Sequence, residues 1–246
     1  MTKNFFALSA VILALTLSTV VGATPATTVN LMSYLAASIQ TPPDTSSIPK
    51  YNRAQQFGGW VHQDPNHHCY NTREMVLARD EDPIVPIKFK ENNCSIATGL
   101  WHEPYTGTDV LDSADLQIDH VVPLKAAYYS GAYDWSGPIR CNYANYLGNN
   151  FHLLTVSGHE NMSKGDRSPD GYLPPNENEL CDYVSKWMKI KIIWQLTASA
   201  AEVRAIQDVI HRENCGEEFL FITNTELADQ RLKASTPIEA CRNFAN

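Results

Sequence analysis

Two short, mostly apolar runs stand out in the middle of the chain, between stretches rich in turn residues. Residues 116–122 alternate apolar and polar side chains and stop at Pro123, and residues 151–156 form the second run; both predict strands. Residues 159–165 follow closely and predict at least one helical turn. The middle of the chain is therefore expected to fold as strand, long loop, strand and helix.

Helical spacing of apolar residues dominates the part that follows. Over 183–194 large apolar side chains recur every three or four positions, and Ser199 with Glu202 forms a capping-box pattern ahead of the next apolar series. Residues 51–118 are rich in aromatic and turn residues, with one short helix expected over 74–79. These elements predict an α+β fold with a loop-rich N-terminal half and added helices.

The two ends of the chain have a different composition. Residues 1–23 place Lys3 ahead of an apolar run and a small-residue site, which is typical of a secretory signal peptide. Residues 24–50 are rich in Ser, Thr and Pro and predict a tether, 51–215 are expected to form the folded domain, and 216–246 a loop or tail. We therefore expect a secreted protein that has no membrane segment once the signal is removed and is a monomer.

All six cysteines lie beyond the expected signal peptide. An even number in an exported chain favours disulfides over metal thiolates. Proximity along the sequence suggests pairs between Cys69 and Cys94, Cys141 and Cys181, and Cys215 and Cys241, out of about 15 possible arrangements.

The overall charge is acidic. The chain has 19 Lys and Arg against 27 Asp and Glu, a net charge of −8. Non-specific binding to nucleic acid depends on positive charge, so this balance excludes a protein that coats nucleic acid by bulk charge. A local positive site beside a metal remains compatible with it.

The chemistry of the chain is expected around Asp119 and His120. They lie between apolar residues of the first predicted strand, where polar side chains are costly to bury without a partner or a function. A carboxylate can hold a hard cation, and a neutral imidazole can take the proton of an attacking water. Adjacent strand residues face opposite sides, so one would act as ligand and the other as base. His152 and Asn161 then complete an order typical of ββα-metal sites.

Several longer motifs surround these residues: Asp119–Leu124, Ala144–Asn145, His152–Leu154, Asn161–Asp166 and Tyr172–Pro175. In these motifs the sequence resembles the HNH (His-Me finger) nucleases related to the C-terminal domain of GmrSD-type restriction endonucleases. The resemblance covers about residues 51–195, because it also takes in Tyr51–Arg53, Phe57–Trp60, Cys69–Leu77 and Ser130–Ala132.

The resemblance implies a ββα-metal (HNH) core and a role for each motif residue. Asp119 would bind the metal, His120 would be the general base, and Asn161 would complete the protein ligands and the catalytic set. Lys164 would contact a substrate phosphate, and His152 would occupy the middle catalytic position, where it orients the base or braces the loop. The implied cofactor is one divalent ion, Mg²⁺ first, with Mn²⁺ or Zn²⁺ as alternatives.

The implied activity is endonucleolytic hydrolysis of phosphodiester bonds in nucleic acid, DNA first, with RNA left open. One departure from the family pattern is Tyr146, which stands where relatives often carry Asp. With the acidic charge, it leaves open a secreted HNH-fold binding module or effector with weak or no turnover. Hydrolysis of another phosphoester is a third alternative. The histidine-rich stretch 62–68 offers a second metal site, although a solvated loop explains it better.

Overall fold

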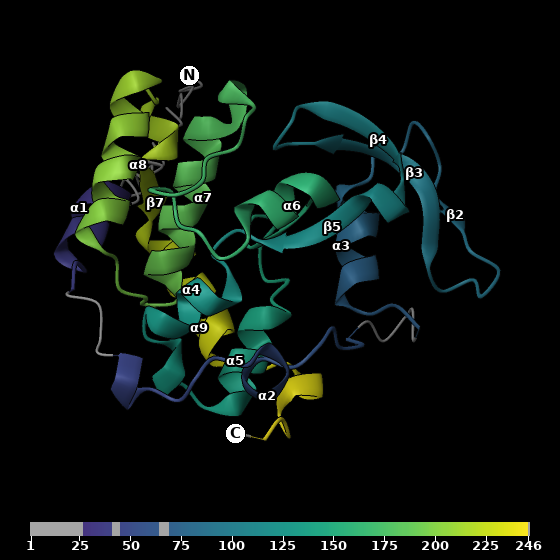
Figure 1. Ribbon diagram of the computed structural model, residues 1–246, viewed down its shortest axis with the longest axis horizontal. Helices are drawn as coiled ribbons and strands as arrows, with labels where there is room; N and C mark the ends of the chain where they lie inside the picture. The colour runs from purple at the N-terminus through teal and green to yellow at the C-terminus, as the bar shows by residue number, and fades with distance from the viewer. Residues whose placement is uncertain (1–26, 41–44, 64–68, 246) are drawn as a thin grey trace, which may run out of the picture.

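The computed structural model describes residues 27–40, 45–63 and 69–245 (Figure 1). The expected signal peptide, the first residues of the expected tether and most of the histidine-rich stretch lie outside the described residues. Within the described part of the chain, no helix is long and apolar enough to cross a membrane.

The centre of the molecule is a two-stranded antiparallel sheet followed by a helix. Strand β5 (Leu116–His120) pairs with β6 (Leu153–Ser157) so that Asp119 lies opposite Leu154, and α6 (Gly158–Lys164) begins directly after β6. The Ser157 side chain accepts from the Glu160 amide and so caps α6. The predicted order of strand, loop, strand and helix is confirmed, with the first strand ending at His120.

Both faces of this small sheet are covered. One face places Leu116, Ile118 and Leu153 in a hydrophobic cluster with α3 (Thr72–Asp80), where the sequence predicts a short helix. The other face meets α6. Because alternate strand residues share a face, Asp119 is presented to α6 rather than to α3.

A second sheet flanks this cluster. It contains β2 (Lys88–Phe89), β3 (Ile96–Glu103) and β4 (Thr108–Asp112) in the antiparallel order β2-β3-β4. Trp101 of β3 is buried, and its indole nitrogen donates to the carbonyl of Leu77 in α3 at 2.8 Å. Figure 1 shows this sheet at the opposite side of the molecule from the long helices, with β5 and α6 between them.

The helical part forms the larger hydrophobic core. The predicted helices are confirmed as α7 (Leu180–Ile193) and α8 (Ala200–Arg212), and both bonds of the Ser199–Glu202 capping box are present. Shorter helices and 3-10 turns connect the main elements: α2 (Arg53–Gln56), α4 (Leu124–Tyr129), α5 (Gly137–Ala144), and turns at Thr45–Ser47, Ser113–Asp115, Ala132–Asp134, Glu177–Glu179, Glu217–Phe219 and Glu239–Cys241. The mixed α+β class is thus confirmed.

The first and last segments among the described residues both take part in the fold, which differs from the expected tether and tail. β1 (Thr28–Asn30) pairs with β7 (Phe221–Thr223), and α1 (Leu31–Ala37) packs against α7 and α8 with Leu31 and Leu35 fully buried. After β7, α9 (Asn224–Ser235) packs on α5 and α7. The Ser, Thr and Pro content of 24–50 concealed a short amphipathic helix that the core requires.

Three disulfides join the described cysteines, and one expected pair is confirmed: Cys69 with Cys94. The other two expected pairs are wrong. Cys141 is bonded to Cys241 and Cys181 to Cys215. Packing explains both, because α5 lies against the turn that carries Cys241 and because α8 returns along α7. Tertiary packing here outweighs proximity along the chain.

Candidate active site

The contact between β5 and α6 brings four polar side chains together. Gln117 and Asp119 are two residues apart on the strand, and Asn161 and Lys164 are three apart on the helix, so each pair shares a face. The Asn161 amide nitrogen donates to Gln117 Oε1 at 2.8 Å, and the Lys164 ammonium donates to Asp119 Oδ1 at 2.8 Å. Two sequence-predicted residues, Asp119 and Asn161, therefore lie on the same side of the sheet.

Asp119 is buried and held at both oxygens. Its side chain accepts from Lys164 at Oδ1 and from the Tyr105 hydroxyl at Oδ2, the latter at 2.6 Å. Burial raises the pKa of Tyr105 well above its usual value, and the negative charge of Asp119 raises it further, so the phenol remains a donor. The carboxylate is consequently fixed in one orientation.

Lys164 lies beneath the site rather than at its surface. Its side chain is 0% exposed, and its ammonium donates to Asp119 and to the His120 carbonyl oxygen. Burial lowers the pKa of Lys164, an effect that the Asp119 carboxylate opposes. The expected contact between Lys164 and a substrate phosphate does not fit this burial, because the whole side chain is used to neutralise and position Asp119.

His120 ends β5 and faces a backbone carbonyl. Its Nε2 lies 2.9 Å from the carbonyl oxygen of Ala144, the last residue of α5. A carbonyl oxygen can only accept, so Nε2 carries the hydrogen and the lone pair of the neutral ring is on Nδ1. Burial lowers the pKa of His120 well below its usual value, and His152 adds to the effect. The imidazole is therefore neutral at neutral pH.

Two residues that precede this region complete the surroundings of His120. The Trp60 ring stacks on the His120 ring with centroids 5.3 Å apart and planes 6° apart. The guanidinium of Arg53 lies over the Trp60 ring, 5.5 Å from its centroid. The His120 ring is thereby held by a hydrogen bond at one edge and by an aromatic ring against its face.

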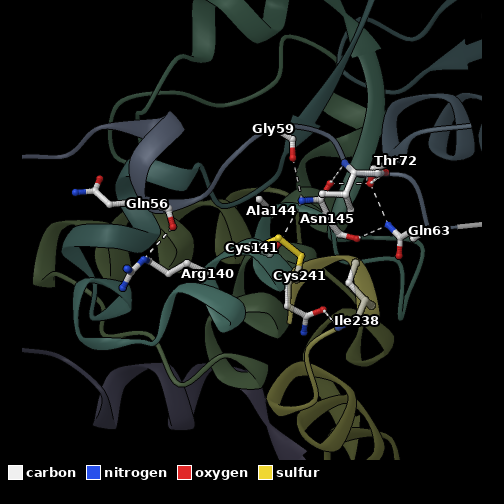
Figure 2. The surroundings of a disulfide bond; sticks show 12 residues. Gln56, Gly59, Gln63, Thr72, Arg140, Cys141, Ala144, Asn145, Ile238 and Cys241 are labelled. Atoms are coloured by element: carbon white, nitrogen blue, oxygen red, sulfur yellow. Dashed lines mark hydrogen bonds between the residues drawn. A yellow bond between two sulfur atoms is a disulfide. The ribbon is translucent and has the colours of Figure 1, made fainter. Parts of the chain in front are cut away.

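Asn145 holds the segment that carries Trp60 (Figure 2). The Asn145 side chain is fully buried, accepts from the Val61 amide at 3.0 Å and from the Thr72 hydroxyl at 2.7 Å, and donates to the Gly59 carbonyl at 3.1 Å. Figure 2 also shows the Cys141–Cys241 disulfide on the same helix, one turn before Ala144. The end of α5 thus positions His120 and Trp60 together.

His152 lies in the core behind His120. It is 1% exposed, and its Nε2 lies 2.8 Å from the Tyr143 carbonyl oxygen, to which it donates. Burial lowers its pKa to about 3, so the ring is neutral. Its ring makes an edge-to-face contact with the His120 ring, with centroids 6.4 Å apart, and it does not line the cleft that His120 borders.

Tyr146, the departure from the family pattern, contacts the C-terminal helix α9 and His152. It is buried, and its hydroxyl donates to Gln230 Oε1 of α9 at 2.9 Å. Its ring packs on His152 with centroids 5.4 Å apart. The residue joins the C-terminal helix to the core, so its effect on the site is indirect.

A cleft of about 380 Å³ opens above these residues. Asp119, His120 and Asn161 all line it, whereas His152 and Lys164 do not. Its remaining wall is formed by Tyr51, Arg53, Ile118, Pro123, Leu124, Lys125, Gly165 and Asp166. The cleft is therefore bordered by a carboxylate, an amide and a neutral imidazole.

The donor chemistry of the cleft fits a hard divalent cation. Asp119 supplies carboxylate oxygens, and Asn161 supplies an amide oxygen whose orientation follows from the bond between its nitrogen and Gln117. Two such ligands leave most of a six-coordinate shell to water and substrate. No group of three or more His, Cys, Asp or Glu side chains suited to a metal occurs among the described residues.

Trp60, Arg53 and Asn145 lie within the motifs that carry the family resemblance, but the sequence alone predicts no role for them. The contacts of Trp60 with His120 and of Asn145 with Gly59, Val61 and Thr72 join residues about 60 to 90 positions apart, which no local periodicity reports. The signal that pointed to them was the motif resemblance, which extended back to Tyr51.

Comparison with known proteins identifies the family of the chain. The family model described as GmrSD restriction endonucleases, C-terminal domain, matches residues 85–209. A protein of Arthroderma benhamiae named "Uncharacterized secreted protein" is 32% identical over 182 residues, which cover 74% of this chain and 82% of that protein. No solved structure shows a significant match. The chain belongs to the family of GmrSD restriction endonuclease C-terminal domains, a nuclease-related family.

Proposed function

We propose that the chain is a metal-dependent HNH endonuclease that hydrolyses phosphodiester bonds of DNA. The observation that carries the proposal is the setting of His120: its Nε2 is committed to the Ala144 carbonyl, its pKa is depressed, and its ring borders a cleft that also presents Asp119 and Asn161. A neutral imidazole beside two hard oxygen ligands is the pair of functions that metal-assisted hydrolysis requires.

In this mechanism His120 is the general base. Nδ1 accepts a proton from the water that attacks phosphorus, and the resulting imidazolium keeps its Nε2–H bond to Ala144. Asp119 and Asn161 would hold one divalent ion, Mg²⁺ by the chemistry of the oxygen donors. That ion supplies charge stabilisation for the phosphate and the leaving oxygen when bound. Lys164 and Tyr105 donate to the two oxygens of the Asp119 carboxylate and hold it in position.

We also place this activity outside the cell. Three disulfides and a relative named as a secreted protein are consistent with an extracellular location. Disulfides persist in oxidising compartments and are rare in the cytosol. An exported nuclease would meet free or foreign nucleic acid.

One observation favours a second candidate, an HNH-fold binding module without turnover. Both oxygens of Asp119 already accept a hydrogen bond, from Tyr105 and from Lys164, and Lys164 balances the charge that would attract a cation. Each carboxylate oxygen retains a second lone pair, so ligation stays compatible with these bonds. The two candidates are separated by activity.

The test is cleavage of supercoiled plasmid by the purified, disulfide-bonded chain with Mg²⁺ or Mn²⁺. EDTA and a His120→Ala variant form the two negative arms, and His102→Ala, at an exposed histidine outside the cleft, is the matched control. Nicking that requires metal and His120 but not His102 supports the proposal.

The opposite result has a clear meaning. A folded wild-type chain that leaves plasmid, single-stranded DNA and RNA intact with both metals would refute the nuclease proposal and favour the binding module. Cleavage that survives in His120→Ala would refute the assignment of the base.

A further inference from the structure

We propose that the Arg53 guanidinium is the group that binds substrate phosphate in this cleft, the role that sequence motifs suggested for Lys164. The inference rests on the proposed nuclease function and adds the residue that recognises the phosphodiester anion. Arg53 lies outside the region matched by the family model, residues 85–209.

The positive charges around the cleft differ in whether they are paired. Lys164 is buried and paired with Asp119, and Lys125 forms an ion pair with Asp166 at the rim. Arg53 is exposed and lines the cleft, and no described residue forms an ion pair with it. It is therefore the uncompensated cation among the cleft residues that the structure describes.

The Arg53 guanidinium is positioned by Trp60 with its N–H edge available. Arg53 opens α2, which Asn52 caps through the Gln55 amide, and its guanidinium lies 5.5 Å from the centroid of Trp60. The interaction with the indole uses the face of the guanidinium. Its N–H groups have no hydrogen-bond partner among the described residues and remain available at its edge. Arginine binds phosphate through this edge, often with two parallel bonds.

Arg53 lines the same cleft as His120, the proposed base. Trp60 contacts both the His120 ring and the Arg53 guanidinium, and Arg53 and His120 line the same cleft, so an anion bound by Arg53 lies in the cleft that His120 borders. A chain with a net charge of −8 repels a polyanion over much of its surface. A single fixed cation at the cleft therefore makes a large difference to binding.

The experiment measures DNA binding by fluorescence anisotropy in the non-cleaving His120→Ala background, with Mg²⁺ and a labelled duplex, over a series of salt concentrations. Arg53→Gln removes the charge, Arg53→Lys keeps it without the planar fork, and Arg204→Gln removes an exposed cation of α8 that lies outside the cleft. Wild-type plasmid cleavage is measured in parallel.

We expect Arg53→Gln to weaken DNA binding about 10-fold, because it removes the charge-assisted bond to phosphate. Arg53→Lys should weaken binding less, because it keeps the charge and loses only the bidentate geometry. The slope of log affinity against log salt should fall by about 0.9 for Arg53→Gln. Arg204→Gln should change neither quantity. In the active background, Arg53→Gln should raise KM more than it lowers kcat.

Equal affinity and salt slope for Arg53→Gln and its parent would overturn the assignment. If the wild-type chain cleaves DNA while Arg53→Gln binds and cleaves as well as it does, only the Arg53 proposal fails. If the wild-type chain neither binds nor cleaves nucleic acid, the proposed function fails and takes this inference with it.

Discussion

Replacement of His152 by glutamine should make the stability of the protein less sensitive to acid. His152 donates from Nε2 to the Tyr143 carbonyl, and its Nδ1 is buried without a hydrogen-bond partner in the described structure. Burial therefore lowers the pKa of its imidazole to about 3. A glutamine amide can keep the donor but cannot be protonated in this range.

The size of the effect follows from the two pKa values. An unfolded histidine titrates near ~6.5. Between this value and about 3 the unfolded chain binds a proton that the folded chain does not, so the free energy of unfolding decreases as pH falls. One such histidine removes about 1.4 kcal/mol per pH unit, or about 2.5 kcal/mol between pH 6 and pH 4. Burial is the main cause of the lowered pKa of His120, so His120 contributes to the slope in the same direction in both proteins.

The measurement is urea unfolding of both proteins at several values between pH 4 and pH 7, with the disulfides intact. The wild-type free energy of unfolding should fall more steeply than that of His152→Gln, by about one proton's worth, ~1.4 kcal/mol per pH unit. Parallel curves would show that His152 is not a buried neutral histidine in the folded state.

Three further results are expected. Lys164→Met leaves the buried Asp119 carboxylate without its counter-charge and should lower the free energy of unfolding, measured with urea, by about 3–5 kcal/mol. A much smaller loss would show that the ion pair is not needed for stability. Trp60→Leu removes the ring stacked on His120 and should reduce plasmid cleavage about 10-fold with an unchanged circular dichroism spectrum, whereas full activity would deny the stack a positioning role. The Cys141→Ser/Cys241→Ser double variant removes a link between residues 100 apart and should lower the free energy of unfolding in denaturant by about 4.7 kcal/mol. Removal of the Cys181–Cys215 disulfide, with its 34-residue separation, should cost about 3.8 kcal/mol, and the reverse order of the two losses would contradict the loop-entropy argument.

Local patterns were sufficient for the centre of the fold. The strand that ends in Asp119 and His120, the returning strand and the two capped or amphipathic helices were all predictable, because periodicity and capping act over a few residues. The alternation of the strand even separates Asp119 from His120, as the structure does: one side chain faces α6 and the other faces the end of α5.

The parts that local patterns missed depend on contacts between distant segments. Lys164 is buried because α6 packs against β5, and the spacing of residues along the sequence does not predict this contact. The partner of Cys141 is set by a helix that returns from residue 224 onward, and the burial of Leu31 is set by the packing of α1 on α7 and α8. A short apolar run among Ser, Thr and Pro carries no sign of such packing.

The site depends on residues on both sides of the matched family region. Arg53 and Trp60 come before residue 85, and α9, which holds Tyr146 through Gln230, comes after residue 209. The end of α5 links these additions, since Cys141 is bonded to Cys241, Asn145 binds the Trp60 segment and the Ala144 carbonyl binds His120. The flanking segments are therefore connected to His120 through one short stretch of helix. A change in either flank should reach the chemistry by altering the position of that carbonyl.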